Sequence, residues 1–78
     1  MLVNVGVNSF VKISEIETIS PPESAPVKRL VNTAKDNNTC VELTYGKRVK
    51  SVIVLKSGRV VLSSVLPQTL VSRIAEIN

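Results

Sequence analysis

The sequence predicts a single α+β domain, residues 1–78, in which two helices cover a small antiparallel sheet. Near the start of the chain and again after residue 39, apolar and polar residues alternate, as they do in half-buried strands. Two other segments carry apolar residues three and four positions apart, as amphipathic helices do. The expected order is two strands, a helix, three strands and a last helix, with no linker or internal repeat.

The opening segments indicate strands. In "LVNVGVN" three valines lie on one face, Val3, Val5 and Val7, and Asn8 with Ser9 reads as a turn. The segments "FVKI" and "EIETIS" also favour strand, with a kink between them, although the spacing of their isoleucines would suit a short helix.

The segment from residue 24 to residue 38 indicates a helix. Ser24 can cap it, Pro26 can occupy its first turn, and the "DNN" stretch can end it. Its apolar face comprises Val27, Leu30, Val31 and Ala34, and its other side carries Lys28, Asn32 and Lys35. The preceding prolines, Pro21 and Pro22, separate this helix from the strands before it.

Three strands and a second helix complete the predicted fold. The segment "TCVELTY" alternates, with one face formed by Val41, Leu43 and Tyr45. The next, "KSVIVLK", is apolar on both faces, which predicts a central or an interface strand, and Ser57-Gly58 forms a hairpin turn into "RVVLSSV". The last segment, "PQTLVSRIAEI", has helical apolar spacing after Pro67, and we expect both helices to cover one face of the sheet.

The composition indicates a thin, aliphatic core. The chain has 78 residues, and a chain of this size buries only about 60% of the surface that it exposes when unfolded. Trp is absent and there is one Phe and one Tyr, so Val, Ile and Leu must fill the core. Self-association is a common supplement for so small a core.

The residue types exclude several kinds of site. With Cys40 as the one cysteine and no histidine, the chain can form no intramolecular disulfide and no Cys/His metal site. Ser63 and Ser64 have no histidine to act as a base, and the three glycines form no phosphate-binding glycine loop. We therefore predict a protein that is not an enzyme and uses no cofactor, metal or small-molecule substrate.

The sequence also predicts a cytoplasmic protein. No apolar run reaches the ~18 residues that a membrane span needs, and the opening "MLVNVGVNSF" lacks the charged head and cleavage site of a signal peptide. A single thiol suits a reducing compartment, and we expect Cys40 to be a small, at least half-buried side chain. The formal net charge of +4 is compatible with an acidic partner such as nucleic acid.

The stretch "TYGKRVKSVIVL" places three basic residues, Lys47, Arg48 and Lys50, within four positions. Because Gly46 follows a predicted strand, residues 46–49 read as a hairpin connection, which lies on the surface. One interpretation is a loop that contacts phosphates, in which Arg48 can form two parallel hydrogen bonds. The alternative is a solubilising surface whose lysines prevent edge pairing.

Two further basic pairs are present. Lys28 and Arg29 open the predicted first helix, where they can contact phosphate or simply form a solvated face or an inter-subunit ion pair with Glu23 or Glu42. Lys56 and Arg59 flank the Ser57-Gly58 turn, at the opposite end of the predicted hairpin from Gly46, and we interpret them as solubilising charge.

Four segments resemble the extracellular matrix regulatory protein A (RemA) family of bacterial DNA-binding regulators. They are "LVNVGVNSFV", "SPPESAPVKRLV", "TYGKRVKSVIV" and "VVLSSVLPQTLVSRI", and they occur in the family's order over nearly the whole chain. The resemblance implies a nucleoid-associated transcriptional regulator of biofilm-matrix and osmoprotection genes. It also implies a subunit fold likened to LytTR domains and a ring of about seven or eight subunits on double-stranded DNA.

The resemblance also assigns residues. The family's paired DNA-contacting arginines after Tyr-Gly correspond to Lys47 and Arg48, and Lys50 takes the place of a third arginine. A further family arginine linked to DNA binding aligns with Glu15, which reverses its charge. Two alternatives therefore stay open: a structural or scaffolding oligomer that has lost strong DNA binding, and an RNA-binding module.

Overall fold

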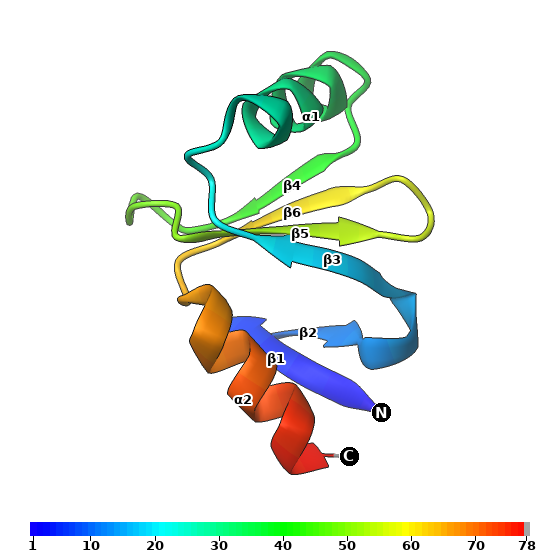
Figure 1. Ribbon diagram of the computed structural model, residues 1–78, viewed down its shortest axis with the longest axis vertical. Coiled ribbons are helices and arrows are strands. Elements are labelled where there is room, and N and C mark those ends of the chain that lie inside the picture. Colours follow the sequence, from blue (N-terminus) through cyan, green and yellow to red (C-terminus); the bar gives the residue numbers. More distant parts are fainter. Residues whose placement is uncertain (78) are drawn as a thin grey trace.

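The computed structural model describes residues 1–77 and confirms the α+β class. That part of the chain forms six strands, a 3-10 helix and two α-helices, and their arrangement is drawn in Figure 1. In chain order the elements are β1 (Leu2–Gly6), β2 (Ser9–Lys12), η1 (Ile13–Glu15), β3 (Ile16–Ser20), α1 (Ala25–Asp36), β4 (Cys40–Leu43), β5 (Ser51–Leu55), β6 (Val60–Ser63) and α2 (Pro67–Ile77).

The strands form two sheets, and one of them is mixed. Strands β1 and β2 pair with each other, whereas the other four lie in the order β3-β5-β6-β4. Within the larger sheet β4 runs parallel to β6, and the other neighbours are antiparallel. The prediction of one antiparallel sheet was therefore wrong, because β4 pairs with β6 and not with β5, its successor in the chain.

The two helices cover opposite faces of the larger sheet (Figure 1). Strand β5 shows why, because its side chains alternate between two apolar clusters. Val52 is buried in the cluster that includes Ala34 of α1, and Ile53 is buried with Leu70 of α2. The expectation that both helices share one face was wrong, whereas the doubly apolar strand is central in the sheet, which is one of the two positions predicted for it.

The first helix begins and ends where its sequence predicts. The Ser24 hydroxyl accepts a hydrogen bond from the backbone N–H of Val27 (3.4 Å), and Pro26 lies in the first turn. After Asp36 the chain turns through Asn38, whose φ of 58° is left-handed, a conformation that asparagine tolerates. Local capping chemistry therefore fixes the limits of α1.

The N-terminal segment differs from the prediction at its turns. Val3 and Val5 are buried, but β1 ends at Gly6, so Val7 lies in the turn with a φ of 45° and is exposed. The expected kink between the next two strand segments is the 3-10 helix η1, and it separates β2 from β3. Three strands therefore precede α1, one more than predicted.

A buried serine joins the two sheets. The Ser63 hydroxyl donates to the carbonyl of Val5 (2.7 Å) and accepts from the backbone N–H of Val65 (3.0 Å). Ser51, its partner on β5, is also buried and donates to the carbonyl of Val65 (2.5 Å). These bonds satisfy buried and part-buried backbone groups at the point where β1, β5 and the entry to α2 meet.

We predict that Ser63→Ala lowers the free energy of unfolding by about 1–3 kcal/mol, because it leaves the buried Val5 carbonyl and the part-buried Val65 N–H without a partner. Urea unfolding at a fixed protein concentration measures this. Ser57→Ala is the matched control, since the Ser57 hydroxyl accepts a long, exposed bond from the backbone N–H of Arg59 (3.5 Å), and it should change stability by less than about 0.5 kcal/mol. Equal stability of the two variants would contradict the role given to Ser63.

Candidate nucleic-acid interface

Three connecting segments meet at one end of the larger sheet. The strand register places Ser20 opposite Val52, Ser51 opposite Ser63, and Ser63 opposite Leu43. Strands β3, β4 and β6 therefore end in one row, at the end where β5 begins. The connections 21–24, 44–50 and 64–66 leave the sheet there, although they are far apart in the sequence.

The basic loop, residues 44–50, is attached at both ends. Thr44 is buried, and its carbonyl accepts from the N–H of Lys47 (2.9 Å) across a turn in which Tyr45 and Gly46 have φ of 48° and 84°. The N–H of Lys50 donates to the carbonyl of Ser63 at the end of β6 (2.9 Å). The basic side chains are thus exposed on a short segment with fixed ends.

The loop is not the hairpin that residues 46–49 were predicted to form. Strand β6 lies between β4 and β5, so the segment 44–50 crosses the end of β6. This crossing also ends the alternation of β4 at Leu43, and Tyr45 is 74% exposed instead of sharing an apolar face with Leu43. The loop nevertheless lies on the surface, as predicted.

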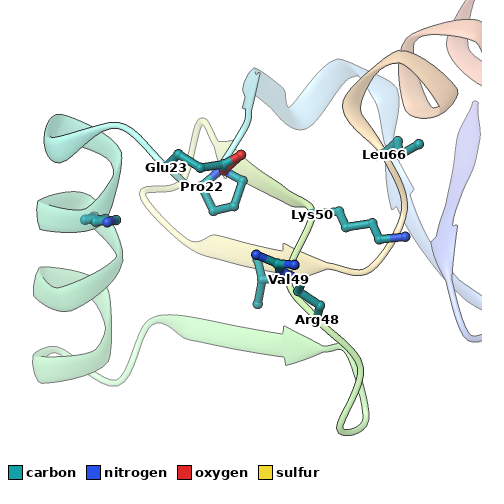
Figure 2. Close-up of a pocket in the computed structure, with 7 residues that line it drawn as sticks. Pro22, Glu23, Arg48, Val49, Lys50 and Leu66 are labelled. Atoms are coloured by element: carbon teal, nitrogen blue, oxygen red, sulfur yellow. The ribbon is translucent and has the colours of Figure 1, made fainter.

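A groove of about 470 Å³ lies between this loop and the start of α1. It is lined by Lys28, Arg48 and Lys50, together with Glu23. Figure 2 shows Glu23 on the segment that precedes α1, on one side of the groove, and Arg48 and Lys50 on the other. Its remaining walls are apolar and come from Pro22, Val49 and Leu66.

The groove brings together three of the five basic residues predicted from the sequence. Lys28 joins Arg48 and Lys50, whereas Lys47 is exposed near the tip of the loop and lies outside the groove lining. Arg29 lines a different depression, beside Gly58 of the β5–β6 turn. The adjacent residues Lys28 and Arg29 therefore belong to different surfaces.

Sequence reasoning missed Glu23 as a member of this site. It was considered only as an ion-pair partner for the Lys28-Arg29 pair, since no local pattern links residue 23 to residues 48–50. The pairing of β3 with the start of β5 brings them together, and that pairing is non-local. Leu66 was missed for the same reason, since the end of β6 places it there.

The opposite end of the sheet carries a second group of charges. The N–H of Lys56 donates to the carbonyl of Glu15 (2.8 Å), and Arg59 closes the same β5–β6 turn. Lys56 and Arg59 therefore lie at the far end from the basic loop, as predicted. Glu15 lies with them, so within one chain its carboxylate is not part of the groove.

Comparison with known proteins finds a family model and several relatives that match most of this chain. A family model described as extracellular matrix regulatory protein A-like matches residues 2–74. A protein of Lachnoclostridium phytofermentans is 42% identical over 73 residues, which is 94% of this chain and 80% of the relative. One of Oceanobacillus iheyensis is 45% identical over 73 residues, 94% of this chain and 85% of the relative. One of Trichormus variabilis is 39% identical over 72 residues, which is 92% of this chain and 82% of the relative. All three carry the provisional name of regulatory protein.

Residues 1–77 contain no group of three or more His, Cys, Asp or Glu side chains that could hold a metal ion. None of the helices in this range is both long enough and apolar enough to cross a membrane. Cys40 is half-buried on β4, as expected, and burial raises the pKa of its thiol, an effect that nearby Lys35 partly offsets.

We expect the Cys40 thiol to be alkylated by iodoacetamide more slowly than the thiol of an unstructured reference peptide at pH 8. A raised pKa leaves less thiolate, the reactive form, at any pH below it, and the deficit should shrink as the pH rises. In 6 M guanidinium the difference should disappear. Faster alkylation of the folded protein at pH 8 would contradict this assignment.

Proposed function

Because the chain belongs to the RemA-like family, we propose that it is a transcriptional regulator that binds double-stranded DNA. The contacts come from the basic end of the larger sheet, with Lys47, Arg48 and Lys50 on the loop and Lys28 on α1. Binding is mainly to backbone phosphates, and no chemical reaction is involved.

The observation that carries the proposal is the convergence of basic side chains from separate segments at one end of the sheet. Lys28 comes from α1, whereas Arg48 and Lys50 come from the loop after β4. Like charges repel in the free protein, so such a cluster disfavours folding slightly unless an anion binds there. A cluster with apolar walls also strengthens the local positive potential.

Phosphate contact suits these residue types. The Arg48 guanidinium can donate two parallel hydrogen bonds to one phosphate, and each lysine adds a compact positive charge. Phosphate contacts position a protein on DNA without reading the bases, so sequence preference would come from DNA shape and bendability. Among residues 44–50, Tyr45 carries the one aromatic ring, and it is exposed. A single ring is a poor platform for stacking the bases of single strands.

We further propose that the working form is a ring of about seven or eight subunits, in which a charge of +4 per chain repeats around the circumference. Several large apolar side chains of the single chain are exposed, among them Leu2, Phe10, Leu30 and Val71. The edge strands β3 and β4 each have one side without a neighbouring strand within residues 1–77. Both features are typical of a surface that a second copy covers.

We predict that Lys47→Ala/Arg48→Ala weakens binding to duplex DNA and flattens its salt dependence. Each phosphate contact contributes about −0.9 to the slope of log affinity against log salt concentration. The double variant should therefore reduce the magnitude of the slope by about 1.8 for each subunit that contacts the DNA. Fluorescence anisotropy of a labelled duplex at several salt concentrations measures both quantities.

Lys56→Ala/Arg59→Ala is the matched control, because it removes the same two charges from the opposite end of the sheet. Equal losses in the two variants would mean that net charge alone governs binding. No difference between wild type and the loop variant at physiological salt would favour a scaffolding oligomer without DNA binding. A clear preference for structured RNA over duplex DNA of equal length, measured by competition, would favour an RNA-binding module.

We expect multi-angle light scattering at micromolar concentration to give seven or eight times the 8.5 kDa mass of one chain. The loop variant should have the same mass as wild type, because its substituted residues are exposed at the loop and are not part of an apolar surface. A wild-type mass of 8.5 kDa would rule out the ring at that concentration.

A further inference from the structure

The adjacent basic residues Lys28 and Arg29 point to different surfaces. Successive helical residues are rotated by about 100°, so neighbours in α1 cannot share a narrow face. Lys28 lines the groove with Arg48 and Lys50. Arg29 lines the depression that includes Leu30 and Gly58, on the side of α1 that faces the β5–β6 turn.

The groove has the chemistry of a site for one phosphate group. Three cationic side chains line it, one of them a guanidinium that can bind two oxygens at once. Pro22, Val49 and Leu66 replace water on its walls, which lowers the local dielectric and strengthens attraction to an anion. Val49 is fixed in turn, because it packs against the buried cluster that includes Val52.

Glu23 places a negative charge in the same groove. In the free protein this carboxylate partly balances the three cations, which eases their mutual repulsion. When a phosphate enters, the carboxylate repels it, so Glu23 lowers the affinity of the site. The residue therefore limits how strongly each subunit holds an anion.

We propose that this groove binds one backbone phosphate of DNA, with Lys28 as its third cation, and that Glu23 weakens that binding. The inference rests on the proposed function for its ligand, and it extends that function by separating Lys28 from Arg29 and by assigning a negative role to Glu23.

The test compares Lys28→Ala with Arg29→Ala, two adjacent substitutions that remove the same charge from the same helix. Anisotropy with a labelled duplex should show a slope reduced in magnitude by about 0.9 per contacting subunit for Lys28→Ala, and a wild-type slope for Arg29→Ala. When the salt concentration rises from 50 to 200 mM, the fold-loss of affinity should then be roughly threefold smaller for Lys28→Ala than for wild type, for each subunit that contacts the DNA. Glu23→Gln, which keeps the side-chain shape, should bind more tightly than wild type. Thermal unfolding of each variant shows whether the fold is intact.

A second arm separates failure of this inference from failure of the proposed function. Inorganic phosphate is titrated into the full ¹⁵N-labelled chain, and amide shifts are compared between the groove, at Lys28 and Lys50, and the β5–β6 turn, at Gly58. Groove shifts in wild type that are absent in Lys28→Ala are the expected result.

Each outcome decides between the claims. If duplex DNA binds but Lys28→Ala and Arg29→Ala behave alike, the groove assignment is overturned and the DNA-binding function stands. If wild type binds no duplex but phosphate shifts the groove amides, the function fails and the anion site stands. If neither ligand binds, both are wrong. Unchanged or weaker binding by Glu23→Gln would overturn the role of that residue.

Discussion

The position of the basic loop depends on the parallel pairing of β4 with β6. Because β6 separates β4 from β5, the connection between them must cross the end of the sheet, and it cannot close as a short turn between neighbours. That crossing lies beside the segment that leads into α1, since β3 ends in the same row. A β4–β5 hairpin would lay no such segment across β6. The convergence of Arg48 and Lys50 with Lys28 is therefore a consequence of strand order.

The remaining elements stabilise that arrangement. The larger sheet is covered on one face by α1 and on the other by α2 with the β1–β2 pair (Figure 1). The Ser63 hydroxyl joins β6 to β1 at the end from which the loop leaves, and the Lys50 N–H donates to the Ser63 carbonyl. The same residue therefore anchors the N-terminal sheet and one end of the basic loop. A thin aliphatic core can hold a loop in place when hydrogen bonds of this kind fix its ends.

The sequence predicts what local chemistry determines. The cap at Ser24, the left-handed exit near Asn38 and the hairpin turn at Gly58 each depend on a few adjacent residues, and the structure has them where expected. Strand pairing depends on contacts distant in sequence, so the parallel β4–β6 pair could not be read from periodicity. The prediction that both helices cover one face overlooked a signal in the sequence. A strand that is apolar on both faces, as β5 is, implies that another element covers each face.

The candidate site also has a part that local sequence predicts and a part that it does not. Lys47, Arg48 and Lys50 were predicted as site residues, because three like charges beside a glycine are visible in the sequence. The separation of Lys28 from Arg29 depends on how α1 lies against the sheet, and no local pattern specifies that. Glu15 shows the opposite case, since its reversed charge is conspicuous in the sequence, yet it lies beside Lys56, away from the loop.

We propose that DNA binds at one end of this sheet and not at the other. The most direct test acetylates the lysines of the wild-type protein with and without duplex DNA and measures the acetylation of each lysine by mass spectrometry. The structure predicts that DNA protects Lys28, Lys47 and Lys50 and leaves Lys56, at the opposite end, as reactive as before. Protection of Lys56 to the same degree, or of Lys56 alone, would contradict the assignment of the DNA-binding surface.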